Sequence, residues 1–421
     1  MNFHGYGTLE IRKFRGSGNS ILFNVKIFDF DRFLKKCKTY KQTLLNNVKN
    51  IWSFTIKLVF YWSLKMRRII QLALFLSIFF LGFLAIDYYI FNRLGTLLGV
   101  SQTIITILVI VFTAAYPVAA ILEGTLSNEF TRIIYTLSAT WMGVALVLGY
   151  TLLAYELVNF VFHIPSFTAG IAVLVVASVI SLYSIVNSSY LNIKEIEIPI
   201  QNLERELKIA QISDTHIGPT RNSGFMKEIV KKIVPLNPDL VLITGDLVEG
   251  TVGLHPSMFD STNNLKSKIF FVTGNHDMYG GLENVFEVLK TTNINILRNE
   301  VVEFEGLQIV GVEYSTKRNY LETVLSGLEI DKSKPSLLMY HVPIEVEFAN
   351  EAGIDLQLSG HTHKGQIFPL NFLGKLVFPY FNGLYNHNGT QVYVSPGTGT
   401  WGPPMRSGSR SEITLINLKK K

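Results

Sequence analysis

The chain has 421 residues, enough for two or three domains, of which 48% are hydrophobic and 17% charged. Its mean hydropathy of +0.28 is high for a soluble protein and predicts a membrane portion. The single cysteine, Cys37, excludes a disulfide framework and a cysteine-based zinc site.

The net charge of +6 is unevenly distributed along the chain. Residues 1–68 contain 14 Lys or Arg against 3 Asp or Glu, a net of +11, so the remainder carries −5. A mildly acidic C-terminal part argues against nucleic acid as a partner. A basic N-terminal segment suits contact with anionic lipid, so we expect membrane lipids as partners.

The N-terminal segment, residues 1–68, allows two interpretations. Between Asp31 and Leu64 lysines alternate with Phe, Leu, Trp and Tyr, as in an interfacial helix, and the apolar run 51–64 is too short to span a bilayer. Alternatively, Met66-Arg67-Arg68 directly before an apolar run is typical of an N-terminus, and residues 1–65 are then an upstream extension that is not part of the native protein.

Four long apolar runs follow, at residues 69–91, 100–122, 133–158 and 167–186. Each reaches the roughly 20 residues that cross a hydrocarbon core of about 30 Å, so we predict four transmembrane helices. Lys and Arg are concentrated before the first run and after the fourth, which favours the cytoplasm for both flanks. The sequence therefore predicts a multi-pass protein of the cell membrane whose C-terminal domain is cytoplasmic.

Residues 187–206 are polar and are predicted to be a linker, although alternation in Ile193–Ile198 also allows an edge strand. From residue 207 to 421 short Val/Ile/Leu/Phe runs alternate with amphipathic stretches such as 225–234 and 282–290. This alternation predicts an α/β domain.

Polar motifs follow five of the apolar, strand-like runs of this domain. In chain order they are Asp214-Thr215-His216, Gly245-Asp246, Gly274-Asn275-His276-Asp277, His341 and Gly360-His361-Thr362-His363. They hold five of the nine histidines in the chain. Because ligands of α/β sheets bind at strand ends, we expect these side chains to form one site.

The residue types in these motifs suit a pair of divalent cations. Carboxylate, amide oxygen and neutral imidazole together are the ligands of hard-to-borderline metal ions. Side chains of a strand alternate with period two, so the Asp-x-His and His-x-His motifs each present both side chains on one side. The candidate ligands are Asp214, His216, Asp246, Asn275, His341, His361 and His363. His276 can move a proton, and Asp277 can orient its imidazole.

The five motifs in this order resemble the calcineurin-like metallophosphoesterase family over residues 207–420. The stretch 397–406, with Glu412-Ile413 after it, resembles the membrane-associated YkuE-like branch. The resemblance implies that the α/β domain has two mixed β-sheets flanked by helices. The predicted fold class is therefore a multi-span α-helical membrane region plus an α/β metallophosphoesterase domain. One departure is Lys364, where many relatives have glycine.

The resemblance also implies roles for individual residues. The first ion would be bound by Asp214, His216 and His363, the second by Asn275, His341 and His361, and both by Asp246. A hydroxide between the ions would attack phosphorus, and His276, held by Asp277, would protonate the leaving oxygen. The two ions are Mn, Fe or Zn, among which the ligand set does not choose.

The expected function is a membrane-anchored phosphoesterase that hydrolyses a phosphomonoester, a phosphodiester or a pyrophosphate, with lipid-linked phosphate as one candidate substrate class. The alternative is a membrane receptor or scaffold whose domain binds a phosphorylated ligand without turnover. Arg406 also has two interpretations, because it can bind a phosphate bidentately or fix the Gly/Pro-rich stretch around it.

Overall fold

The computed structural model describes residues 11–15, 21–25, 77–78, 80–250 and 253–421. The predicted interfacial segment and residues 69–76 of the first predicted span lie outside these ranges. The chain divides into two compact units, Met1–Leu81 and Gly82–Lys421. In the first unit, strand β1 (Ile11–Arg15) pairs antiparallel with β2 (Ile21–Val25).

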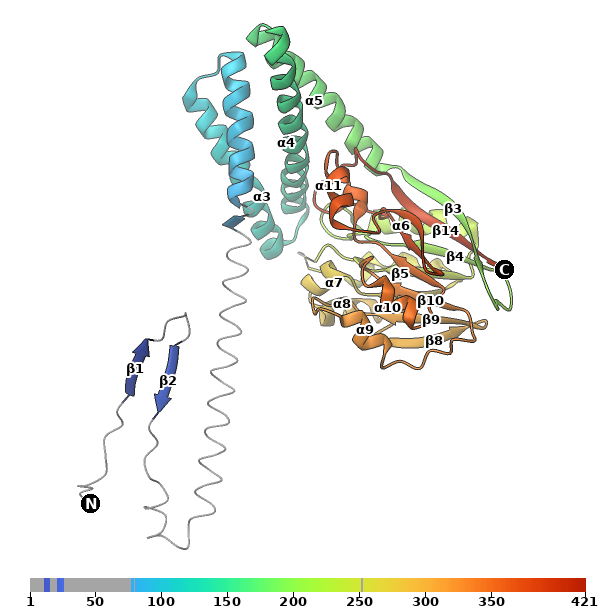
Figure 1. The fold of residues 1–421 in the computed structure, drawn as a ribbon. Coiled ribbons are helices and arrows are strands. Elements are labelled where there is room, and N and C mark those ends of the chain that lie inside the picture. Colours follow the sequence, from blue (N-terminus) through green and yellow to red (C-terminus); the bar gives the residue numbers. More distant parts are fainter. Residues whose placement is uncertain (1–10, 16–20, 26–76, 79, 251–252) are drawn as a thin grey trace, which may run out of the picture. The chain divides into compact units, whose positions relative to one another are not determined.

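Long apolar helices open the second unit (Figure 1). Residues 77–78 and 80–98 are helical, and α3 (Gln102–Leu126), α4 (Glu129–Phe162) and α5 (Ser166–Ser189) follow. Helices α3, α4 and α5 are each long and apolar enough to cross a membrane. They contain the second, third and fourth of the apolar runs.

Polar contacts join these helices in their interior. The Asp87 side chain is fully buried and accepts hydrogen bonds from Oγ1 of Thr113 on α3 (2.9 Å) and Nε1 of Trp141 on α4 (3.1 Å). Arg93 pairs with Glu156 of α4. Polar groups inside a membrane are costly unless they are paired, so these contacts specify how the helices pack.

The α/β domain contains two six-stranded mixed sheets. The strands of the first, in spatial order, are β3 (Leu191–Ile200), β14 (Ser411–Lys420), β4 (Leu207–Ile212), β5 (Leu240–Thr244), β6 (Lys268–Val272) and β7 (Ile294–Ile296). Those of the second are β12 (Gly383–His387), β13 (Thr390–Val394), β11 (Leu356–Ser359), β10 (Ser336–Tyr340), β9 (Leu307–Val312) and β8 (Glu300–Phe304).

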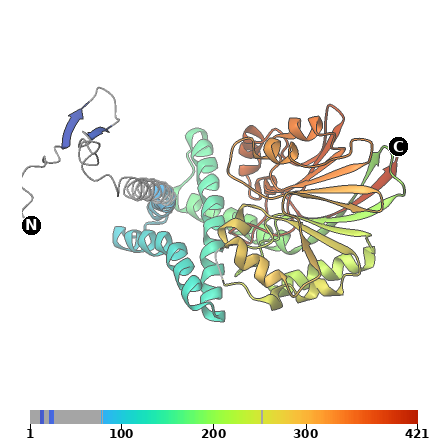
Figure 2. The same cartoon turned by 90° about the horizontal axis from the view of Figure 1, so that it is seen from below.

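The two sheets pack face to face, with helices on their outer faces (Figure 2). Strand β5 illustrates why, since all five of its residues are buried. Leu240 and Leu242 enter the core between the sheets, whereas Val241 and Ile243 face the helix side.

The helices on the outer face of the first sheet are α6 (Ser223–Ile233) and α8 (Leu282–Leu289), and those on the second are α9 (Tyr320–Leu325) and α10 (Val346–Glu351). The predicted fold class, apolar helices plus two mixed sheets flanked by helices, is confirmed.

The segment predicted as a linker contains strand β3. This strand pairs in parallel with β14 along ten residues, from Leu191 with Ser411 to Ile200 with Lys420. The sheet therefore begins directly after α5, sixteen residues before the predicted domain boundary at 207. Of the two predictions for this segment, only the edge strand at Ile193–Ile198 agrees with the structure.

Side chains at the end of α5 fasten it to the α/β domain. The amide of Asn187 donates to the carbonyl oxygens of Arg406 (2.8 Å) and Ser409 (3.0 Å), and Oγ of Ser188 donates to that of Pro404 (2.7 Å). Helix α4 touches the same stretch at Gly143, where a Cβ would lie 2.5 Å from Sδ of Met405. The stretch around residues 403–409 is thus the contact between the helices and the domain.

Candidate metal centre

The structure gathers the seven predicted ligands at the carboxyl ends of β4, β5, β6, β10 and β11. The backbone there is unusual, because Asp214, His216, Asp246, His361 and His363 all have φ between 48° and 70°. Such left-handed conformations cost a non-glycine residue about 1–3 kcal/mol each and concentrate at functional sites.

A first cluster consists of Asp214, His216 and His363, whose ligand atoms all lie within 4.8 Å of one another. Nε2 of His363 is 3.1 Å from Nε2 of His216 and 3.4 Å from Oδ1 of Asp214. All three side chains are buried. These are the residues that the resemblance assigns to the first ion.

A second cluster consists of Asp246, His341 and His361. Nε2 of His341 is 3.2 Å from Oδ2 of Asp246 and 3.3 Å from Nδ1 of His361. The same Oδ2 is 3.8 Å from Nε2 of His216 in the first cluster. Asp246 therefore lies between the two clusters, in contact with a histidine of each.

Several polar atoms of the site fit bound cations. Oδ2 of Asp214 and Oδ1 of Asn275 are buried without a hydrogen-bond partner among the described residues. Buried polar atoms are normally satisfied, so these two oxygens need a partner that the protein does not supply. Together with imidazole nitrogens converging to 3.1 Å, they form a mixed N/O donor set suited to divalent ions.

Outer contacts orient two of the imidazoles. Nδ1 of His341 donates to the carbonyl oxygen of Thr244 (2.8 Å), which leaves Nε2 free for the cluster. Nδ1 of His216 lies 2.9 Å from Oε2 of Glu249, an ion-pair contact that directs the Nε2 side of the ring towards the cluster. Outer contacts with carbonyl and carboxylate oxygens orient the rings of metal ligands.

Sequence reasoning missed Glu249, which is buried and belongs to a third cluster with His216 and His276. Its only sequence signal is its position three residues after Asp246, in the loop that leaves the same strand. A single glutamate in a loop has no characteristic pattern.

Burial keeps two imidazoles of the site neutral. Desolvation lowers the pKa of His361 to about 3 and the pKa of His363 well below its ordinary value. Burial alone would raise the pKa of Asp246, but the adjacent His341 outweighs it and holds that pKa well below its usual range. Neutral imidazole and ionised carboxylate are the forms that bind metal.

The expected hydrogen bond between Asp277 and His276 is not what the structure shows. Nδ1 of His276 donates to the carbonyl oxygen of Glu249 (2.8 Å). The Asp277 carboxylate accepts from the backbone N–H of Gly274 (2.7 Å) and Val248 (3.0 Å). Asp277 caps the first turn of α7 (Asn275–Tyr279), so its side chain points back along the chain. Burial raises the pKa of Asp277 to about 7.

Two glycines allow the close approach of the motifs. A Cβ at Gly274 would lie 2.2 Å from Oδ1 of Asp246, and one at Gly360 would lie 2.2 Å from Oδ2 of Asp214. Any side chain at either position would displace a candidate ligand.

Arg406 fixes the loop at residues 397–406. Its side chain is fully buried and donates to the carbonyl oxygens of Gly399 (2.6 Å) and Pro396 (2.9 Å) and to Oγ of Ser409 (2.6 Å). Of the two interpretations of Arg406, the structure supports the one in which it stabilises the loop. Trp401 of this loop is half-exposed beside His276, with 6.3 Å between ring centroids.

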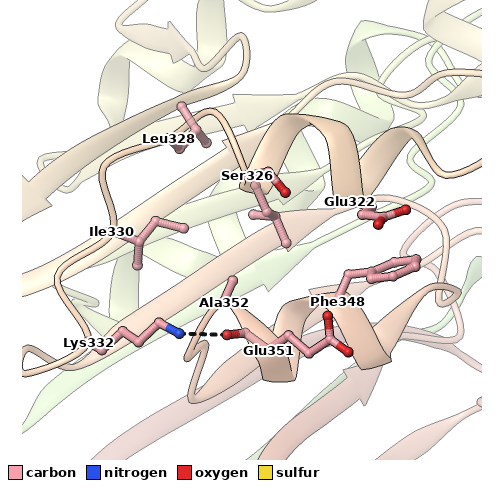
Figure 3. A pocket seen from close by; sticks show the side chains of 9 residues that line it. Glu322, Ser326, Leu328, Ile330, Lys332, Phe348, Glu351 and Ala352 are labelled. Carbon is pink, nitrogen blue, oxygen red and sulfur yellow. Dashed lines mark hydrogen bonds between the residues drawn. The ribbon is translucent and has the colours of Figure 1, made fainter.

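A separate pocket of about 330 Å³ lies between α9 and α10 (Figure 3). Its lining includes Glu322, Ser326 and Phe348, and Nζ of Lys332 donates to the carbonyl oxygen of Glu351 there (2.7 Å). None of the candidate metal ligands lines this pocket, so it is distinct from the metal centre.

Replacing Glu249 with glutamine is expected to weaken metal binding about 10- to 100-fold, because the amide orients His216 less strongly than the carboxylate does. Metal titration of the chelated protein measures the effect. The matched control is Glu329→Gln, at an exposed position. Equal affinity in the Glu249 variant and in wild type would show that this contact does not support the site.

Residues 207–365 match the model of the calcineurin-like phosphoesterase family. An uncharacterized metallophosphoesterase of Helicobacter pylori J99 is 41% identical over 237 residues, which are 54% of this chain and 64% of the relative. The chain thus spans slightly less than two thirds of that relative's length.

Three further relatives extend the likeness. An uncharacterized metallophosphoesterase of Aquifex aeolicus is 31% identical over 259 residues, 58% of this chain and 98% of the relative. A Danio rerio protein described as a transmembrane protein with metallophosphoesterase domain is 34% identical over 279 residues, 61% of this chain and 64% of the relative. YkuE of Bacillus subtilis, the protein for which the predicted branch is named, is 28% identical over 235 residues, 50% of this chain and 79% of YkuE.

Proposed function

The chain belongs to the calcineurin-like phosphoesterase family, as its motifs predict, and we propose that it is a membrane-anchored, metal-dependent hydrolase of phosphate esters. The substrate bond is a phosphomonoester, a phosphodiester or a pyrophosphate. The observation that carries this proposal is the position of Asp246, whose Oδ2 lies 3.2 Å from His341 and 3.8 Å from His216 and so adjoins both ligand clusters.

Two divalent ions fit the donor set that the chain offers. Asp214, His216 and His363 would hold one, Asn275, His341 and His361 the other, and Asp246 both. Mn, Fe and Zn all accept such mixed nitrogen and oxygen ligands. Bound ions of this kind supply Lewis-acid polarisation of a phosphoryl group and lower the pKa of water.

His276 is the proposed proton donor to the leaving oxygen. Its Nδ1 donates to the carbonyl oxygen of Glu249, so Nε2 is the nitrogen that remains for proton transfer. The backbone N–H of His276 donates to Oδ1 of Asp246 (2.8 Å), which ties the imidazole to the residue shared by both clusters. Asp277 acts on the turn that holds His276 rather than on the imidazole.

We further propose that the helices make a multi-pass anchor with the phosphoesterase domain on the cytoplasmic side. Three helices of suitable length and the helical residues 80–98 support four spans. The basic residues of 1–68 and the cations after α5 support a cytoplasmic location for both flanks. An enzyme held at the membrane meets lipid-linked phosphates first, which makes them the favoured substrate class.

The proposal is tested by hydrolysis of an aryl phosphomonoester and an aryl phosphodiester by the full chain, after chelation and after Mn²⁺ is added back. Activity is expected to require the metal. His276→Ala is expected to lower kcat by about 10²- to 10⁴-fold without loss of bound metal, because only proton transfer is removed. His255→Ala, at an exposed position outside the clusters, serves as the matched control.

The receptor or scaffold alternative would be favoured if the protein binds two ions but cleaves neither aryl esters nor phospholipids in vesicles. Equal activity of His276→Ala and wild type would instead assign proton transfer to another group.

A further inference from the structure

Helix α11 (Leu370–Val377) exposes an apolar face beside the metal centre. Leu376 is 83% exposed and Val377 70%, and Phe372 and Leu373 are exposed as well. The helix follows the turn that contains His363, and the ring of Phe378 at its end packs edge-on against His361, with 5.5 Å between centroids. An exposed apolar face of this kind marks a binding surface for a membrane or a partner.

Contacts with α4 indicate that this surface faces the membrane. Phe368, just before α11, packs edge-on against Tyr150 of α4, with 5.4 Å between ring centroids, and Ile367 is buried in the same cluster as Leu152. Helix α4 is apolar and exposed as far as Phe162. A helix rises about 1.5 Å per residue. A bilayer core of about 30 Å that begins at Phe162 therefore covers α4 past Tyr150 and ends about 10 Å beyond it.

Helix α11 therefore lies at the depth at which interfacial helices bury their apolar face, about 5–10 Å below the headgroups. Figure 1 shows α11 at the edge of the domain next to α4. The exposed apolar residues of α11 are then in contact with lipid rather than with water.

A groove of about 410 Å³ joins this helix to the transmembrane surface. Its walls include Ala85 and Ile86 of the first helix, Gly149 and Leu153 of α4, and Pro369 at the start of α11. Leu153 is 57% exposed and Ile86 37%, so the groove is open on the side where lipid chains lie. The volume is within the usual range of ligand sites, about 300–1,000 Å³, and the lining is apolar.

We propose that this groove holds an acyl chain of the substrate, which is a phospholipid that enters from the bilayer past α11. The inference rests on the proposed phosphoesterase function and specifies its substrate class. In the reaction, the oxygen of water bonds to phosphorus while the bond between phosphorus and the leaving oxygen breaks. Water gives up one proton to the solvent, the leaving oxygen receives one from His276, and His276 regains its proton from the solvent, so the proton count balances.

A lipid is favoured over a protein segment because of where the groove lies. It opens between two helices of the membrane bundle, and its lining contains no charged side chain. It ends at Pro369, six residues after the metal-ligand candidate His363. A chain seated there places its headgroup towards the two clusters.

The substitution Gly149→Leu tests the groove. A Cβ at Gly149 meets no atom within 4 Å, so the helix accepts a side chain here, and leucine occupies space that belongs to the groove. The matched control is Gly82→Leu, at a position in the first helix where a Cβ also meets nothing within 4 Å and which is not among the residues that line this groove. Both variants replace glycine with a better helix former, so the comparison isolates the groove.

The measurement is hydrolysis of the aryl phosphodiester by the detergent-solubilised full chain, with phosphatidic acid, phosphatidylglycerol or glycerol 3-phosphate as competitor. We expect both lipids to compete in wild type and Gly82→Leu, and to compete about tenfold more weakly in Gly149→Leu. That loss corresponds to about two methylene groups no longer buried. Glycerol 3-phosphate should compete weakly and equally in all three proteins.

Two results would overturn the inference. If the lipids compete no better than glycerol 3-phosphate, the site recognises phosphate alone, and if they compete equally in Gly149→Leu and Gly82→Leu, the groove binds no chain. If the wild type cleaves neither the aryl esters nor phospholipids in vesicles, the proposed function itself fails, and the inference falls with it.

Discussion

Replacing Asp246 with asparagine is expected to lower phosphoesterase activity about 10³-fold and to reduce the bound metal. The amide keeps the shape of the side chain and an acceptor for the N–H of His276, but it loses the negative charge that both clusters share. Metal ions contribute several kcal/mol to transition-state stabilisation, and each 1.36 kcal/mol corresponds to a factor of ten in rate.

The measurements are kcat on the aryl diester and the number of metal ions per chain. Asp260→Asn, at an exposed position, is the matched control and is expected to behave as wild type. Two ions and full activity in Asp246→Asn would show that this carboxylate is not the shared ligand.

The second large effect is expected at Arg406. Arg406→Ala is predicted to lower the free energy of unfolding of the domain by about 3–5 kcal/mol, because it removes a buried charge and leaves the carbonyl oxygens of Gly399 and Pro396 without their donor. Arg406→Lys keeps the charge but not the planar set of donors, so an intermediate loss is expected.

Denaturant unfolding of the detergent-solubilised chain, followed by tryptophan fluorescence, measures this loss. Arg410→Ala removes an exposed arginine from the same segment and is expected to have little effect. If Arg406→Ala unfolds like wild type but loses affinity for inorganic phosphate, Arg406 binds substrate and does not hold the loop.

The positions of the candidate ligands could be predicted because each motif follows a buried strand. An apolar run that ends in Asp-x-His or His-x-His indicates the strand and the end at which the polar groups lie, but the alternation of side chains along a strand does not set their direction, because these residues follow the strands in left-handed conformations. The packing of the two sheets then brings together residues as distant as Asp214, after β4, and His363, after β11. Local sequence is sufficient to predict this part of the site, because the arrangement of the strands brings the motifs together.

Other features depend on contacts that no local pattern encodes. Glu249 contacts His216 only because the loop after β5 places it beside that imidazole. Asp277 caps its own turn and does not contact the imidazole of His276, although the two residues are adjacent in sequence. The two interpretations of Arg406 differ only in burial, which the Gly/Pro-rich stretch around it does not reveal. The segment after α5 looks like a linker because its partner β14 is more than 200 residues away.

The place of β14 in the first sheet also constrains the biosynthesis of the protein. Strand β14 lies between β3 and β4, although it follows both of them and every other strand of the domain in the chain. While the ribosome is still adding residues before Ser411, β3 and β4 have no neighbour on the sides that β14 will occupy, and their edges are open to wrong pairing. The apolar helices can therefore form during translation, whereas the α/β domain closes only after the ribosome has passed its final strand.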